Sequence, residues 1–229
     1  MNDEKYILVL GSKPGSNLPN LNVSKIYSAN GAAERARIYS KTFGIKFLVA
    51  VTGTKSFYSN KYEGVRERIL DSKPNLIYFR SGKVEDKELN NMNFISKSKF
   101  DQCHFQSKFL KYGILSVFLS ELAMENKIMS KTRLIWNIFV HDAMLGASTG
   151  LFSIMLAKHE NPNYKIIISG IGIKSLGDTF YGKGSKQRAA TDRKIFSHLN
   201  ANFKKDLITT DIEMANYCNI PLYKNLIKE

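Results

Sequence analysis

The chain has 229 residues, 43% of them hydrophobic, which is enough to bury one substantial core and predicts one main domain. Its 34 lysine and arginine residues against 20 aspartate and glutamate residues give a net charge of +14, which predicts anionic partners such as nucleic acid, a sugar nucleotide or an acidic membrane surface. Cys103 and Cys218 belong to no C-x-x-C or His/Cys cluster, which argues against a zinc site and for two reduced thiols.

Near the N-terminus an apolar run ends in a glycine-rich loop. Residues 7–10 show no polar alternation, which is typical of a parallel strand covered by helices on both faces. Glycine has no Cβ, so a turn at the end of such a strand can bring backbone N–H groups to a phosphate. The spacing is neither G-x-G-x-x-G nor that of the Walker loop, and a tight turn without a ligand explains the stretch equally well. The candidate anion loop consists of Gly11, Ser12, Lys13, Pro14, Gly15 and Ser16.

Strands and helices alternate over the next part of the chain. Asn30 follows the second strand, where its amide can donate to a phosphate or read a base edge, or serve as an ordinary helix cap. The rhythm favours right-handed βαβ crossovers and a mostly parallel sheet, that is, a Rossmann-like α/β fold. Strands are predicted over 25–31, ending in a polar turn, and over 47–51 and 76–79, and helices from 32 and over 62–70.

The middle of the chain has fewer sequence patterns that indicate secondary structure. Residues 83–109 are polar and predict a loop region. Residues 113–124 repeat apolar side chains at helical spacing and predict a core helix, and residues 134–140 are compatible with a buried strand. His141 and Asp142 follow that strand directly.

Two further small-residue turns adjoin buried elements. Residues 148–150 open an apolar helix over 151–159, and the strand 166–168 runs into a Ser-Gly pair. Ligands of open α/β sheets bind at the carboxyl ends of the strands, so both turns join the first loop as candidate ligand contacts. The residues concerned are Ser148, Thr149, Gly150, Ser169 and Gly170.

The C-terminal third begins with a change of character. Glycine, lysine and arginine crowd around Tyr181, and a basic helix is expected from about 187 to 199. We expect residues 174–205 to form a mobile lid, with 1–173 and 206–229 as the α/β domain. A final helix over 208–218, capped by Thr209 or Thr210, and a last strand over 220–223 complete the predicted order.

No stretch predicts export or a membrane span. Asp3 and Glu4 precede a very short apolar run, which is wrong for a signal peptide. The most apolar long region, residues 134–157, is interrupted by Asn137 and by the His141-Asp142 pair. We expect a cytoplasmic protein that contacts an anionic inner membrane peripherally through its positive charge.

Six short motifs occur in a fixed order: GSKPGS at 11–16, Asn30, STG at 148–150, ISGI at 168–171, a basic segment with Tyr181, and TTDI in the stretch 209–223. This order resembles the bacterial sialyltransferases of the Campylobacter type. In that family the corresponding motifs are G-N-G-P-S, an asparagine after the second strand, T-S-G, S-G-I, a lid and N-T-D-I. The resemblance implies a transferase that uses a CMP-activated acidic sugar without a metal or other cofactor, and the absence of a D-x-D pair agrees with that.

The resemblance also implies roles for the motif residues. The loop 11–16 and Asn30 would hold the CMP phosphate and ribose, while Ser148, Thr149, Gly150, Ser169 and Gly170 would hold the base and the donor sugar. In the family two lid tyrosines stabilise the leaving phosphate and a lid histidine accepts the acceptor proton. Here Tyr181 is the lid tyrosine, and Asp206 lies nearest the position where the family has its histidine.

The general base has more than one candidate. His198, at the end of the basic helix, has a side chain whose free pKa of about 6.5 suits a proton acceptor. Asp142 could act as the base, as carboxylates do in other transferases, or cap a loop. Cations that could neutralise phosphate in place of a second tyrosine, or simply form a solvated face, are Lys183, Lys186, Arg188 and Arg193.

We expect the acceptor to be a surface glycan or glycolipid, such as lipooligosaccharide or capsule, and the oligomeric state stays open. The alternative is a basic nucleotide- or nucleic-acid-binding α/β protein without transferase activity. Nucleic acid is the less expected partner, because aromatic residues are not interleaved with basic ones as in a single-strand platform. A dehydrogenase would need the G-x-G-x-x-G loop and an acidic ribose contact where Asn30 stands.

Overall fold

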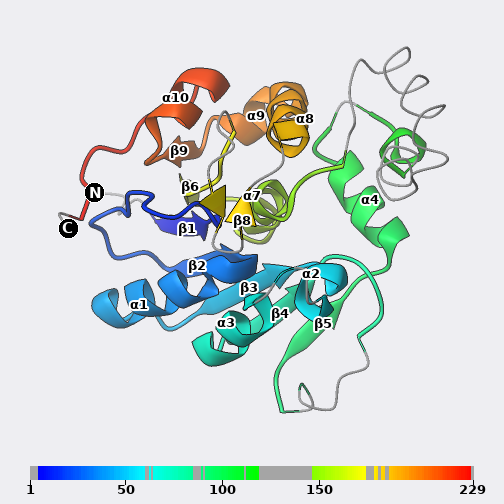
Figure 1. Cartoon of the computed structure of the whole chain (residues 1–229). Helices are drawn as coiled ribbons and strands as arrows, with labels where there is room; N and C mark the ends of the chain where they lie inside the picture. Colours follow the sequence, from blue (N-terminus) through cyan, green and yellow to red (C-terminus); the bar gives the residue numbers. More distant parts are fainter. Residues whose placement is uncertain are drawn as a thin grey trace.

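A parallel sheet of seven strands, in the order β5-β4-β3-β2-β1-β6-β9, forms the centre of the molecule (Figure 1). The computed structural model describes residues 5–59, 62, 64–84, 89, 91–110, 112–118, 146–173, 178–179, 182–183 and 186–227. Each neighbouring pair in this sheet is parallel, so the predicted Rossmann-like α/β fold is confirmed. The strands are β1 (Tyr6–Leu10), β2 (Lys25–Ala29), β3 (Leu48–Thr52), β4 (Leu76–Phe79), β5 (Phe94–Ser96), β6 (Lys165–Ser169) and β9 (Leu207–Thr209).

Helices cover both faces of the sheet, which explains the apolar runs without alternation. Ile7 and Val9 of β1 pack in the cluster that contains α7, whereas Leu8 and Leu10 pack against α1. In Figure 1, α1 and α3 lie on the left side of the sheet, and α7, α8 and α9 lie on its right side. The helices are η1 (Asn30–Ala32), α1 (Ala33–Phe43), α2 (Thr54–Tyr58), α3 (Val65–Ser72), α4 (Lys99–Ser107), α7 (Thr149–Glu160), α8 (Lys186–His198), α9 (Ala201–Lys204) and α10 (Ile212–Cys218).

The strand order reverses between β1 and β6. From β1 the chain continues to β2 on one side, whereas from β6 it continues to β9 on the other. The two strands end side by side, with Leu10 opposite Ser169. A switch point of this kind is where open α/β sheets leave room for ligands, so the fold places the first loop and the Ser-Gly strand end at the expected position.

The prediction of a loop region over 83–109 is wrong in part. The structure has the edge strand β5 and the helix α4 there. β5 is three residues long and exposed throughout, so it has no apolar run to reveal it. α4 begins with a capping box in which Ser98 and Asp101 satisfy each other's backbone N–H groups, a local signal that the sequence does contain.

The C-terminal elements also differ from the prediction. Residues 207–209 form β9, and the last helix begins at Ile212 with Asp211 as its cap, because Thr209 continues the sheet. The expected last strand is reduced to an isolated parallel bridge between Thr209 and Leu222. The strand expected over 134–140 and the second half of the helix expected over 113–124 lie outside the described residues.

The segment expected as a lid contains a short antiparallel hairpin, β7 (Asp178–Thr179) with β8 (Gly182–Lys183), followed by α8. The end of α8 is part of the core: Ile195, Phe196 and Leu199 are buried in the cluster that contains α7. The division into a domain and a lid stays a prediction. Within the part of the chain that the structure describes, no helix has the length and apolar character needed to cross a membrane.

Candidate functional site

The loop after β1 (residues 11–17, the β1 loop) is joined to the loop after β6 (residues 170–173, the β6 loop). Gly11 N–H donates to the Ser169 carbonyl at 2.8 Å, and Lys13 N–H donates to the Gly170 carbonyl at 3.0 Å. A Cβ on Gly11 would lie 2.2 Å from the Gly170 oxygen, and one on Gly170 would lie 2.7 Å from Ser16 Oγ. The two glycines therefore allow the two loops to pack backbone against backbone.

The tip of the β1 loop is open to solvent. Pro14 and Gly15 are exposed, and no atom lies within 4 Å of the position that a Cβ on Gly15 would take. Gly15 has a φ of +61°, a conformation that glycine adopts without a steric penalty. The backbone of the tip is thus accessible from solvent.

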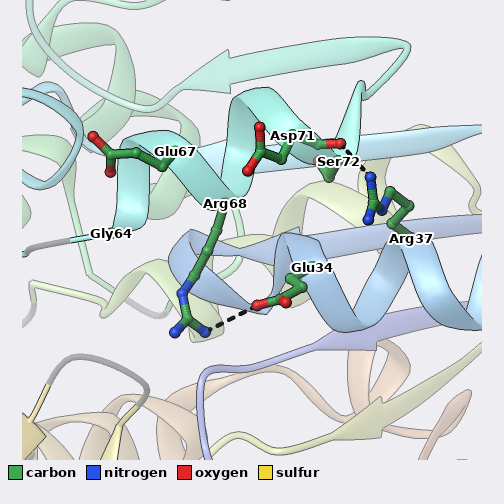
Figure 2. Close-up of a pocket in the computed structure, with 7 residues that line it drawn as sticks. All are labelled: Glu34, Arg37, Gly64, Glu67, Arg68, Asp71 and Ser72. Carbon is green, nitrogen blue, oxygen red and sulfur yellow. Dashed lines mark hydrogen bonds and ion pairs between the residues drawn. The ribbon is translucent and has the colours of Figure 1, made fainter.

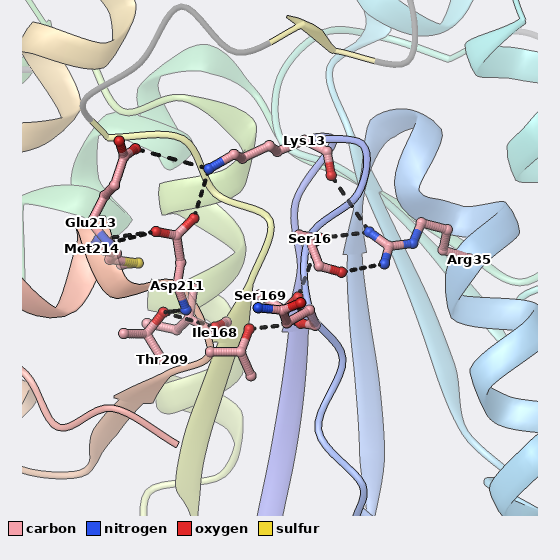
Figure 3. Close-up of polar contacts among 11 residues, drawn as sticks. Lys13, Ser16, Arg35, Ile168, Ser169, Thr209, Asp211, Glu213 and Met214 are labelled. Atoms are coloured by element: carbon pink, nitrogen blue, oxygen red, sulfur yellow. Dashed lines mark hydrogen bonds and ion pairs between the residues drawn. The ribbon is translucent and has the colours of Figure 1, made fainter. Parts of the chain in front are cut away.

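Hydroxyl groups donate to backbone carbonyls at the end of the β1 loop and in the neighbouring strand β6. Ser169 Oγ and Thr210 Oγ1 each donate to the Asn17 carbonyl at 2.7 Å, and Thr209 Oγ1 donates to the Ile168 carbonyl at 3.0 Å (Figure 3). Ser169 is fully buried. Its hydroxyl therefore anchors the loop, whereas the sequence predicted a direct contact with the donor.

Charged side chains connect the β1 loop to elements on two sides. Figure 3 shows Lys13 extending from the loop to α10, while Arg35 of α1 approaches Ser16 from the opposite side. The Lys13 ammonium lies 2.9 Å from Asp211 Oδ2 and 3.9 Å from Glu213 Oε2. The loop predicted to bind an anion is therefore already bridged to two carboxylates of α10.

Neither Arg35 nor the carboxylates were predicted as site residues. Asp211 also caps α10, because its Oδ1 accepts from the backbone N–H groups of Glu213 and Met214 at 2.9 and 3.2 Å. The T-T-D order before an amphipathic stretch was a usable signal for this cap. Arg35 carries no such signal, because its contact with the loop depends on the packing of α1 beside β1.

Asn30 follows β2 directly and lies next to the β1 loop. Its φ is +50°, in the left-handed region that non-glycine residues rarely adopt, and it is 8% exposed. Thr52 Oγ1 donates to Asn30 Oδ1 at 3.0 Å, which orients the amide. Ser12 Oγ donates to the Ala29 carbonyl at 3.1 Å and ties the loop to the same strand end.

The S-T-G turn forms the N-terminus of α7. Ser148 Oγ accepts from Leu151 N–H at 3.2 Å, so Ser148 is the cap, and its own N–H donates to Asp192 Oδ1 at 2.9 Å. A Cβ on Gly150 would lie 3.3 Å from the side chain of Ile171, which places the first turn of α7 against the β6 loop. The positive end of the α7 dipole therefore lies beside the two loops.

Three side chains from separate elements hold the residues just before α7. Arg80 Nη1 donates to the Ala147 carbonyl at 2.5 Å, and Gln106 Oε1 accepts from Ala147 N–H at 3.3 Å. Asp192 of α8, 4% exposed, holds Ser148. The sequence singled out none of these three residues, since each acts on a backbone group far away along the chain.

His198 is the last residue of α8 and contacts Tyr112. The hydroxyl of Tyr112 lies 3.0 Å from His198 Nε2, and the two rings meet edge to face with centroids 5.0 Å apart. His198 follows Asp192 by six residues of helix, which is about 9 Å along the axis. Leu199 next to it forms a bridge with Leu110.

Four other residues were considered for catalysis, and the structure describes only one of them. Tyr181, His141 and Asp142 lie outside the described residues. Asp206 pairs with Lys158 at 2.6 Å, and it immediately precedes β9, at the end of the sheet opposite the site.

The cations expected in the lid lie along the hairpin and α8. Arg193 donates to the Ile173 carbonyl at 2.8 Å and thus supports the β6 loop. Lys183 is in β8, and Lys186 and Arg188 are in the first turn of α8.

A pocket of about 200 Å³ opens elsewhere, between α1 and α3 (Figure 2). Both of its arginines have partners: Arg68 lies 3.3 Å from Glu34, and Arg37 donates to the Asp71 carbonyl at 2.9 Å. No strand end contributes to its lining. The pocket therefore stands apart from the site at the switch point.

The described residues contain no group of metal ligands, and both of their cysteines are free thiols. Among them, no three His, Cys, Asp or Glu side chains form a group that could hold a metal ion. Cys103 is buried, and burial raises the pKa of the Cys218 thiol to about 12, so Cys218 keeps its proton at neutral pH.

The chain was compared with protein-family models, with curated proteins and with solved structures, and none of the three comparisons finds a match.

Proposed function

We propose that this chain is a metal-independent glycosyltransferase that moves sialic acid or a related acidic nonulosonate from its CMP donor to a surface-glycan acceptor. One observation carries the proposal. Three small-residue turns, at 11–16, 148–150 and 169–170, meet at the carboxyl ends of β1 and β6, where the strand order reverses. A nucleotide phosphate is the ligand that such a junction suits, since the exposed tip of the β1 loop and the N-terminus of α7 both lie at it.

The donor would lie across this junction. Its phosphate would bind at the exposed tip of the β1 loop, with Asn30 toward the ribose and Ser148 and Thr149 toward the base and sugar. Lys13 would supply the cation by exchanging Asp211 and Glu213 for the phosphate. Since CMP leaves as an anion, a lysine in this place would stabilise the charge that develops in the transition state.

The reaction is a displacement at the anomeric carbon. The acceptor hydroxyl oxygen forms the new glycosidic bond, the bond from the sugar to the phosphate oxygen breaks, and CMP leaves with that electron pair. The hydroxyl proton passes to a general base, for which His198 and Asp142 stay the candidates. Asp192, whose carboxylate reaches the N-terminus of α7, joins them.

The test measures binding first and turnover second. We expect CMP to bind in excess EDTA more tightly than UMP or NAD, by isothermal calorimetry, and a panel of CMP-sugars to show turnover with one acidic sugar. The variants His198→Ala, Asp142→Asn and Asp192→Asn then identify the base, because its loss lowers turnover about 10²–10⁴-fold while CMP affinity stays nearly constant. Strict Mg²⁺ dependence, or CMP binding no tighter than that of NAD, contradicts the proposal.

The net charge of +14 supports a second candidate, a nucleotide- or nucleic-acid-binding protein without transferase activity. Short oligonucleotides in the same calorimetric series separate the two. Tight oligonucleotide binding that falls steeply with salt, together with no turnover of any CMP-sugar, favours this second function.

A further inference from the structure

The tip of the β1 loop depends on neighbouring elements for its conformation. Pro14 and Gly15 are exposed, and nothing packs over the Cβ position of Gly15. Contacts at the two ends of the loop must therefore hold it. The β6 loop holds one end, through the N–H groups of Gly11 and Lys13. Ser169 and Thr210 hold the other end at the Asn17 carbonyl, and Ser16 lies between that end and the tip.

Arg35 holds Ser16 with both arms of its guanidinium. Nη1 donates to Ser16 Oγ and Nη2 donates to the Ser16 carbonyl, each at 2.5 Å, and Nη1 also lies 3.5 Å from the Lys13 carbonyl. Arg35 is in the first turn of α1, a rigid element packed on the sheet. The side chain is half-buried, so water competes for these hydrogen bonds less than at an exposed site.

We propose that Arg35 is the positioning residue of the β1 loop: it fixes the loop in the conformation that receives the donor phosphate. The inference rests on the proposed function and adds a residue to it. Arg35 acts through Ser16 and the Lys13 carbonyl, while its positive charge lies behind the loop and favours an anion in front of it.

The planar guanidinium is central to this role. Two donors in one plane reach a hydroxyl and a carbonyl of the same residue, whereas a lysine ammonium supplies the charge without two coplanar N–H donors. Arg35→Lys therefore keeps the charge and loses the geometry, and Arg35→Met loses both. Arg37→Met is the matched control, because Arg37 is on the same helix and also donates to a carbonyl, that of Asp71 on α3.

The first experiment needs no ligand. Hydrogen exchange of the free protein should show the amides of residues 15–17 exchanging about tenfold faster in Arg35→Met than in wild type, and unchanged in Arg37→Met. Ser16→Ala removes one of the two acceptors and should give a smaller increase. If Arg35→Met folds poorly, the exchange rates of Ser16→Ala test the same contact in its place. Equal exchange in Arg35→Met and Arg37→Met overturns the inference.

The second experiment measures CMP affinity and donor kinetics. We expect CMP to bind Arg35→Met about tenfold and Arg35→Lys about threefold more weakly than wild type, with Arg37→Met unaffected. In turnover the KM for the CMP-sugar should rise by similar factors while kcat changes less, a split that simple loss of folded protein does not produce. Wild-type affinity in Arg35→Met overturns the inference.

Failure of the proposed function is distinguishable from failure of this inference. If wild type does not bind CMP, the proposed function is wrong, and the exchange experiment alone then decides whether Arg35 holds the loop. If wild type binds CMP and the Arg35 variants bind it equally well, the function stands and the role of Arg35 is overturned.

Discussion

Gly11 and Gly15 belong to the same loop, but the structure requires glycine there for different reasons. Gly11 faces the Gly170 carbonyl, where a Cβ would lie 2.2 Å from the oxygen. Gly15 has free space around it and a positive φ. One position is limited by crowding against backbone, the other only by backbone conformation.

This difference predicts unequal costs of substitution. Gly11→Ala forces the two loops apart and should lower the free energy of unfolding by about 3 kcal/mol or more. Gly15→Ala should cost about 1 kcal/mol, the usual penalty of a left-handed alanine. Urea unfolding of both variants measures the difference. Equal urea midpoints for the two variants would show that crowding against the Gly170 carbonyl adds no cost at Gly11.

Asp211 has two separable roles, as the partner of Lys13 and as the cap of α10. Asp211→Asn keeps an oxygen that accepts from Glu213 and Met214 but removes the ion pair, so we expect it to cost less than about 1 kcal/mol. Asp211→Ala loses both roles and should cost about 1 kcal/mol more. A double-mutant cycle with Lys13→Met, followed by urea unfolding, isolates the pair. A zero coupling energy would contradict a stabilising bridge.

At the scale of elements, α7 links the core to the site. Its residues from Leu151 to Ala157 are buried, and its N-terminus faces the β6 loop. A helix that is apolar on all sides depends on tertiary packing, while its first turn depends on the Ser148 cap.

The cap predicts a position-dependent effect of removing a serine hydroxyl. Ser148→Ala leaves the N–H of Leu151 without its acceptor and should lower stability by about 1 kcal/mol, and Ser148→Asn should restore most of it. Ser153→Ala is the control within the same helix, because that hydroxyl only donates to the Thr149 carbonyl, and we expect a smaller change. Thermal and urea unfolding measure both. Equal losses would mean that burial, and not capping, determines the cost.

At the scale of the whole molecule, several buried groups resist losing a proton. Burial raises the pKa of Tyr78 to about 12 and that of Cys218 to about 12, and it also raises the pKa values of Tyr27 and Tyr39. A group whose pKa is higher in the folded state than in the unfolded state loses its proton less readily when folded. Its contribution to stability is present below the unfolded pKa and disappears as the pH rises toward the folded one.

We therefore expect a melting temperature that is nearly constant from pH 7 to about 9 and falls between about 10 and 12. Tyr78→Phe removes one of these groups, so at pH 11 the variant should lose less of its melting temperature than wild type, by about 2–4 °C. Differential scanning calorimetry across this range tests the expectation. An identical alkaline fall in both proteins would remove Tyr78 from the explanation.

The sequence by itself determined the layers of the fold and the places where chemistry can occur. Apolar runs such as residues 7–10 indicate strands buried on both faces, because burial on two sides removes the alternation. The turns at Gly11, Ser148 and Ser169 were identified as strand or helix ends for the same local reason. Exposed or short elements were missed, since β5 buries no residue and leaves no pattern.

Only the tertiary structure decided which of these ends meet and what holds them. Lys13 contacts Asp211 across 198 residues of chain, and Arg35 reaches Ser16 from a helix beyond the next strand. The structure likewise places His198 against Tyr112, which lies 86 residues away along the chain. Periodicity reports on the burial of each segment, whereas these contacts depend on strand order and helix packing, which are properties of the whole chain.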